Sequence, residues 1–162
     1  MIGMSIERWD VIRKIRCVAD YQFGRGIGEI LFPDDVELVF SKRTGRVRYI
    51  YLNGELLATL RPSDGLFSLA IGGAKRILKL CNAKRMIVKV RDEAAPHIRR
   101  GRNVFAKHVL DADDGIHPQE EVIVVNRNGE ILAVGRALLT GREMKTFRRG
   151  VAVKVRKGVE EV

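Results

Sequence analysis

Two Asn-Gly pairs, one in each half of the chain, constrain its fold more than any other feature. Asn53-Gly54 separates two runs of strand-forming residues, and Arg127-Asn128-Gly129 separates two others. Asn-Gly is the strongest short-range signal for a β-hairpin, because both residues tolerate the positive φ that a type I′ turn requires. We therefore predict an antiparallel hairpin in each half. The runs concerned are residues 46–52 and 55–61 around the first pair and residues 121–126 and 130–139 around the second.

The first part of the chain, residues 1–84, is predicted to be an α+β domain. Apolar residues spaced by three or four follow Ser5, a residue type that favours the N-cap, so the domain begins with an amphipathic helix. Trp9 lies on the apolar stripe, which predicts a core position. A run at residues 36–41 extends the hairpin to a three-stranded antiparallel meander, and residues 74–80 have helical spacing. Asn82-Ala83-Lys84 is the predicted linker.

Residues 85–158 are predicted to form a small mixed β-barrel with two short helices, followed by a tail at residues 159–162. Many short strands with antiparallel neighbours, and few helices to cover a sheet, favour a closed or nearly closed barrel. The predicted strands outside the second hairpin are residues 85–90, 101–109 and 151–155.

Capping signals place the two short helices of this barrel. One carries Pro96 in its first residues, and the other starts at a Thr140-x-x-Glu143 capping box and is expected to turn Met144 and Phe147 inward. Each helix ends in an Arg pair followed by Gly, as Arg99-Arg100-Gly101 and Arg148-Arg149-Gly150. Cations near a helix C-terminus interact favourably with the helix dipole. Two Arg pairs beside strands can also donate paired hydrogen bonds to phosphate groups.

The stretch from Gly101 to Val109 combines three cations with the alternation of a strand. Val104, Ala106 and His108 are expected to point to one face, and Phe105, Lys107 and Val109 to the other. Gly101 lets the backbone turn or approach a ligand closely. Two interpretations stay open. The stretch is either a positively charged binding site for a phosphate chain or an ordinary core strand flanked by solvated charges.

The charge balance points to a polyanionic partner. Thirty Lys and Arg against twenty Asp and Glu leave a formal net charge of +10. Residues 1–84 hold 14 basic and 9 acidic residues, and residues 85–162 hold 16 and 11, so each part carries +5. The charge is therefore built into both parts, and nucleic acid is the first candidate partner.

Two further basic features lie in the first part. Tyr21, Phe23 and Arg25 adjoin a Gly-rich segment that is consistent either with a helix end and turn or with a platform beside an unpaired base. Arg43 and Arg46 crowd the turn between the first two strands, where a solvated loop and a phosphate contact are equally consistent with the sequence.

Several function classes find no support in the sequence. Cys17 and Cys81 are too few for a zinc ligand set or a disulfide framework, and the acidic patch Asp111, Asp113 and Asp114 lacks the pattern of a calcium loop. We expect no metal and no cofactor. No apolar run approaches the ~20 residues of a membrane span, and the N-terminus lacks a signal peptide's layout, so we expect a cytoplasmic protein.

Two sets of residues carry resemblances to known families. In the second part they are Ala94-x-Pro96 and residues 101–107, 133–137 and 150–155, and in the first part they are residues 19–24, 44–48 and 58–67. Through these residues, the second part resembles a PUA domain, the RNA-binding pseudobarrel of pseudouridine synthases and archaeosine transglycosylases. The first part resembles the domain that precedes the PUA domain in archaeal tRNA-guanine transglycosylase and archaeosine synthase.

This resemblance implies an archaeal tRNA-binding protein equivalent to the C-terminal half of those enzymes. The PUA part would hold the acceptor stem and CCA end, and the first part would grip the tRNA near its D-arm, where Tyr21 or Phe23 would stack on a base. The RNA-binding residues so implied, together with the basic residues noted above, are Arg100, Gly101, Arg102, Asn103, Phe105, Lys107, His108, Arg148, Arg149, Tyr21, Phe23, Arg25, Arg43 and Arg46.

The enzymes' catalytic barrel, with paired aspartates and a Cys/His zinc site, has no counterpart in these residues. His97, His108 and His117 have no acid or nucleophile at a spacing that suggests chemistry. We therefore expect a non-catalytic tRNA-binding protein that assists a transglycosylase or archaeosine synthase subunit supplied in trans. The alternative is a ribosome- or translation-associated PUA factor; an interaction adaptor and a small enzyme are the remaining hypotheses.

Overall fold

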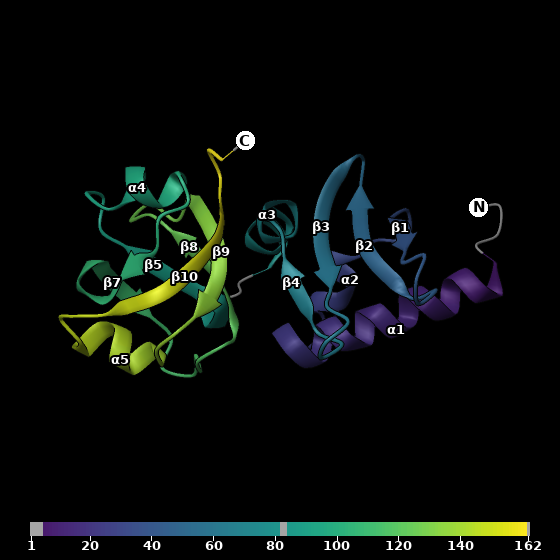
Figure 1. Ribbon diagram of the computed structural model, residues 1–162, viewed down its shortest axis with the longest axis horizontal. Coiled ribbons are helices and arrows are strands. Elements are labelled where there is room, and N and C mark those ends of the chain that lie inside the picture. The colour runs from purple at the N-terminus through teal and green to yellow at the C-terminus, as the bar shows by residue number, and fades with distance from the viewer. Residues whose placement is uncertain (1–4, 82–83, 162) are drawn as a thin grey trace. The chain divides into compact units, whose positions relative to one another are not determined.

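The computed structural model describes residues 5–81 and 84–161, and the chain divides into two compact units, residues 1–81 and residues 82–162 (Figure 1). The predicted linker residues Asn82 and Ala83 lie outside the described residues. Together the units have the predicted α+β class, a helix with an antiparallel sheet followed by a nearly closed barrel.

Unit 1 packs three helices against an antiparallel sheet. Ser5 caps the first helix, its Oγ accepting from the Arg8 amide at 3.1 Å, as the sequence predicted. The sheet has the order β1-β2-β3-β4. The elements are α1 (Ile6–Phe23), α2 (Ile27–Leu31), β1 (Glu37–Phe40), β2 (Val47–Leu52), β3 (Glu55–Leu60), β4 (Phe67–Leu69) and α3 (Ile71–Leu80).

Strand alternation decides which face of this sheet is buried. Ile50, Ala58 and Leu69 stand opposite one another across three strands, and all are at most 1% exposed. The neighbouring row contains Tyr49, which is 37% exposed, and the half-buried Thr59. One face therefore packs on the helices, as expected when successive side chains point to opposite faces.

The sequence missed part of unit 1. The meander has a fourth strand, β4, which pairs with β3; the Gln22 side chain holds its first residue by accepting from the Phe67 amide at 2.7 Å and donating to the Phe67 carbonyl at 2.8 Å. Trp9 is not a core residue, because it is 42% exposed and its ring stacks under the Arg16 guanidinium at 5.6 Å. Ile12, about one turn further along α1, is the fully buried core residue instead.

Unit 2 is a six-stranded barrel with the order β6-β10-β9-β8-β5-β7, in which β5 and β8 are parallel and the other pairs antiparallel. A one-turn 3-10 helix joins the two outermost strands, β6 and β7, so the sheet curls round until its edges nearly meet. The elements are η1 (Lys84–Met86), β5 (Ile87–Val90), α4 (Ala95–Arg99), β6 (Val104–Phe105), η2 (Ala106–His108), β7 (Val109–Ala112), β8 (Glu121–Val125), β9 (Ile131–Ala137), α5 (Gly141–Thr146) and β10 (Val151–Gly158).

The single strand predicted at residues 101–109 is therefore wrong, because η2 divides it. Val104 and Ala106 are buried and Phe105 and Lys107 exposed, as alternation requires, but the turn of η2 shifts the phase so that Val109 returns to the core at 7% exposed. The capping box of α5 is confirmed, with the Thr140 side chain and the Glu143 side chain each accepting from the other residue's amide.

Candidate nucleic-acid interface

The antiparallel seam between β6 and β10 brings together the two basic stretches that the sequence singled out. Phe105 stands opposite Val151, and the Ala106 amide donates to the Gly150 carbonyl at 2.9 Å. Further along, Asn103 Oδ1 accepts from the Val155 amide at 3.0 Å. Residues 101–107 therefore run antiparallel to residues 150–158, and the loop before β10 lies beside η2.

Five exposed cations flank this seam, and we call them the seam cations: Arg100, Arg102, Lys107, Arg148 and Arg149. Lys107, Arg148 and Arg149 lie near the start of β10, where Gly150 meets Ala106. Arg100 and Arg102 lie near its end, where the Glu160 amide donates to the Arg99 carbonyl at 2.9 Å. Arg102 and Lys107, one from each group, are five residues apart in the sequence, so their Cα atoms are separated by at most about 18 Å.

No side chain of a seam cation has a hydrogen bond or ion pair within the described part of the chain. Other cations form hydrogen bonds that stabilise the fold. Arg8 donates to the Asp34 and Val36 carbonyls at 2.9 and 2.6 Å, and Arg76 donates to the Ile30 carbonyl at 2.9 Å. The seam cations are thus exposed and available to an external anion.

Two phenylalanine rings lie among these cations. Phe105 is 47% exposed, and the half-buried His108 ring meets its edge with 6.5 Å between centroids. Phe147, which was predicted to point inward with Met144, is 44% exposed, whereas Met144 is fully buried. The error arises because α5 ends at Thr146, so Phe147 already has an extended backbone with ψ 140° and leaves the buried face. The sequence therefore missed one aromatic residue of this face.

Two predicted interface residues have roles in the fold. Asn103 is exposed, but its side-chain oxygen holds β10 through the Val155 amide. Gly101 has φ +98°, and a Cβ at this position would collide with the Glu161 carboxylate. The space through which a ribose was expected to approach Gly101 is thus taken by a side chain from the predicted tail.

In unit 1 the base-stacking prediction is wrong for Phe23 and consistent with the position of Tyr21. Phe23 is 6% exposed and belongs to the core, whereas Tyr21 is 85% exposed and Arg25 is exposed. Two residues apart on a helix of 3.6 residues per turn point to opposite sides, so only one of the two rings can face solvent. Gly24 and Gly26 have positive φ, which confirms that a turn follows α1.

Arg43 and Arg46 occupy the turn between β1 and β2. The Arg46 carbonyl accepts from the Ser41 amide at 2.7 Å, which closes the turn and leaves both arginine side chains exposed. Nearby in β2, the Arg48 guanidinium lies 5.8 Å from the centroid of the Tyr49 ring. The basic turn between β1 and β2 therefore lies at the surface of unit 1.

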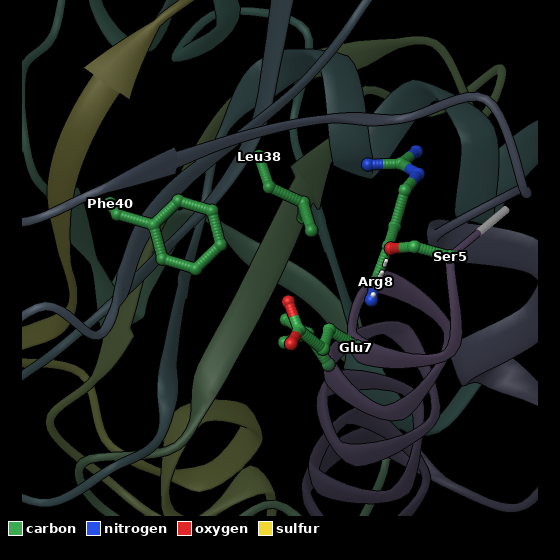
Figure 2. A pocket seen from close by; sticks show the side chains of 6 residues that line it. Ser5, Glu7, Arg8, Leu38 and Phe40 are labelled. Carbon is green, nitrogen blue, oxygen red and sulfur yellow. Dashed lines mark hydrogen bonds between the residues drawn. The ribbon is translucent and has the colours of Figure 1, made fainter.

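A hollow of about 370 Å³ lies between the start of α1 and β1 (Figure 2). Val11, Leu38 and Phe40 give it an apolar wall, and Phe40 is 48% exposed. Its one cation, Arg8, is already bound to two backbone carbonyls. This hollow suits an apolar side chain better than a phosphate.

The acidic patch of unit 2 is tied to α5. Lys145 Nζ lies 2.8 Å from the Asp114 carboxylate, and this hydrogen bond lowers the pKa of Asp114 and raises the pKa of Lys145.

Across residues 5–81 and 84–161, no three His, Cys, Asp or Glu side chains are grouped so that they could hold a metal ion. Over the same residues, no helix combines the length and the apolar character that crossing a membrane requires.

Comparison with known families agrees with this two-part architecture. Residues 86–159, which lie in unit 2, match the PUA domain. Residues 13–84 match the patch-forming domain C2 of tRNA-guanine transglycosylase. The chain thus contains the two consecutive domains of the C-terminal region of archaeal tRNA-guanine transglycosylases, and both predicted resemblances are confirmed.

Individual relatives match nearly the whole chain but are much longer than it. The tRNA-guanine(15) transglycosylase of Thermococcus kodakarensis is 50% identical over 155 residues, which are 96% of this chain and 26% of that protein. The enzyme of the same name from Methanothermobacter thermautotrophicus is 46% identical over 92% of this chain and 23% of its own length. The chain therefore spans about a quarter of these curated relatives.

Solved structures show the same fold. A hypothetical protein from Pyrococcus horikoshii superposes with a TM-score of 0.73 and 28% identity, covering 93% of this chain and 91% of that one. A conserved PUA domain protein from Thermoplasma acidophilum has a TM-score of 0.67 at 20% identity, covering 97% and 92%.

Proposed function

We propose that this chain binds tRNA, with unit 2 holding the acceptor stem and its single-stranded CCA end along the β6–β10 seam. The observation that carries the proposal is the set of five seam cations, which are exposed, have no partner within the described residues and surround two exposed phenylalanines. Phosphates would pair with the cations, and unpaired bases would stack on Phe105 and Phe147.

The physical properties of RNA suit such a surface. An A-form helix hides its base edges in a deep, narrow groove, so proteins recognise its backbone, its shape and its unpaired ends. A seam with cations near both of its ends and exposed aromatic rings beside them would follow a backbone and still contact a single-stranded end. The homology to transglycosylases that act on tRNA supports tRNA as the RNA concerned.

The proposed role is non-catalytic. His117 is exposed and paired with Glu120 at 2.9 Å, and His108 contacts the Phe105 ring, so neither has a serine, threonine or cysteine side chain as its described partner. A catalytic transglycosylase or archaeosine synthase subunit, acting in trans, is the proposed protein partner. The apolar hollow beside α1 is the surface that we assign to it, because its wall is apolar and its one cation is occupied.

Salt titration tests the RNA-binding proposal. If the chain neutralises ~6 phosphates, its affinity for a tRNA transcript should fall about a thousandfold between about 50 and 200 mM salt. Fluorescence anisotropy with labelled transcript would measure this slope. Affinity that is independent of salt, or turnover of tRNA by the purified chain alone, would contradict a non-catalytic RNA-binding protein.

A pull-down from native lysate that recovers ribosomes and no modification enzyme would instead favour a translation-associated factor.

Unit 1 has its own test. Tyr21→Ala should weaken binding of intact tRNA about tenfold, since stacking on one base contributes ~1–3 kcal/mol, and should leave binding of an isolated acceptor minihelix unchanged. The matched control is Tyr21→Phe, which keeps the ring and should retain the affinity. Equal losses of affinity for intact tRNA and for the minihelix would contradict a contact between Tyr21 and the D-arm.

A further inference from the structure

The last described residues of the chain form a turn that packs on the end of α4. The Val159 amide donates to the Leu132 carbonyl at 2.9 Å, and the Glu160 amide donates to the Arg99 carbonyl at 2.9 Å. A Cβ on Gly158 would collide with the Arg99 carbonyl, so the two backbones are as close as glycine allows. The predicted tail is therefore seated against the end of the seam.

This turn fixes one carboxylate directly over Gly101. Glu161 Oε1 accepts from the Gly158 amide at 2.8 Å, and the carboxylate fills the space in which a Gly101 side chain would stand. Oε1 is the oxygen that makes this bond, and Oε2 has no partner among the described residues. The exposed Arg100 and Arg102 flank Gly101 in sequence, yet neither forms an ion pair with Glu161 in the described structure.

A fixed carboxylate beside two arginines discriminates between the groups of an RNA backbone. It repels a phosphate oxygen, because both are negative, and it accepts a hydrogen bond from a hydroxyl. A ribose offers a 2′-hydroxyl, and the last ribose of an RNA also offers a free 3′-hydroxyl next to it. The arginines can meanwhile pair with the preceding phosphates.

We propose that Glu161 is a specificity-determining residue, whose free carboxylate oxygen accepts a hydrogen bond from the terminal ribose of an RNA 3′ end that lies against this carboxylate and not against Gly101 itself. The chain would thereby select an RNA with a free hydroxyl end over one that ends in phosphate. This proposal rests on RNA binding at the seam and adds the chemical group that is recognised there.

The test compares three minihelices that share a stem and a single-stranded CCA end. One ends in a ribose with both hydroxyls, one in a 3′-phosphate and one in a 2′,3′-dideoxyribose. The unaltered chain should bind the hydroxyl end about tenfold more tightly than either of the others, since a hydrogen bond to a charged group is stronger than one between neutral groups. In Glu161→Ala this ratio should fall to about one. Glu161→Gln keeps an oxygen that can accept from the Gly158 amide, and its affinity ratio should lie between those of the unaltered chain and Glu161→Ala.

Glu160→Ala is the matched control, because it removes the same charge from an exposed neighbour and should keep the discrimination. Unchanged discrimination in Glu161→Ala would overturn the proposal. So would a uniform gain in affinity for all three ends, which would show that the carboxylate merely competes with phosphate. If the unaltered chain binds none of the minihelices, RNA binding at the seam fails and the proposal with it. Thermal unfolding of each variant separates these outcomes from a loss of fold.

Discussion

Replacing Arg102 and Lys107 together with glutamate is expected to weaken tRNA binding about a hundredfold at ~0.1 M salt, with the thermal unfolding of the protein nearly unchanged. Two phosphate contacts would be lost, so the slope of log affinity against log salt should become shallower by about two. The fold should tolerate the change, because both side chains are exposed and have no partner in the described structure. Surface substitutions of this kind usually alter stability by about 0.5 kcal/mol or less.

A variant with the same change in net charge separates local contact from general electrostatics. Arg85 and Arg127 are exposed cations in η1 and in the turn between β8 and β9, neither of them on β6 or β10. Their replacement with glutamate also lowers the net charge by four. If the seam is the binding surface, this control should lose about tenfold or less through the long-range field alone. Equal losses in the two double variants would mean that tRNA contacts no particular face of unit 2.

Much of the fold was predictable because its signals are local. Both hairpins, the Ser5 cap and the Thr140–Glu143 capping box depend on residues within four positions of one another, and each is present in the structure. The second turn is not of type I′, because Gly129 has positive φ and Asn128 does not. The barrel followed from counting strands against helices. The exposed cations of the seam were also predictable, because Arg and Lys without a nearby acid in sequence usually remain in water.

What the sequence could not reveal depends on which distant segment covers a side chain. Phe23 and Tyr21 are two residues apart, and the packing of unit 1 alone decides that the first is buried and the second exposed. Phe147 is apolar and follows a buried helix face, yet the helix ends one residue earlier. The contact between Gly101 and Glu161 joins residues sixty positions apart, and no periodicity signals it.

A buried ion pair makes unit 2 sensitive to a single substitution. The Arg156 guanidinium donates to both carboxylate oxygens of Glu121, at 2.5 and 3.1 Å. The Glu121 side chain is 1% exposed and that of Arg156 is 34% exposed. A carboxylate at this depth is tolerated only while it is paired, because its water has been removed.

Removing the two partners one at a time should therefore have unequal effects. Arg156→Met leaves a charge buried without its cation and should cost about 3 kcal/mol of unfolding free energy. Glu121→Gln leaves a neutral amide beside a cation that reaches solvent and should cost about 1 kcal/mol. Combining Glu121→Gln with Arg156→Met should recover much of the larger loss, because no buried charge then remains.

Urea unfolding followed by two probes measures these effects within one molecule. Trp9 is the sole tryptophan of the chain and lies in unit 1, so its fluorescence reports that unit, while far-UV circular dichroism reports both. Arg156→Met should shift the dichroism transition of unit 2 to lower urea and leave the tryptophan transition in place. If Glu121→Gln proved as costly as Arg156→Met, hydrogen bonding and not the buried charge would be the source of the stability. A shift in both transitions would show that the two units unfold together.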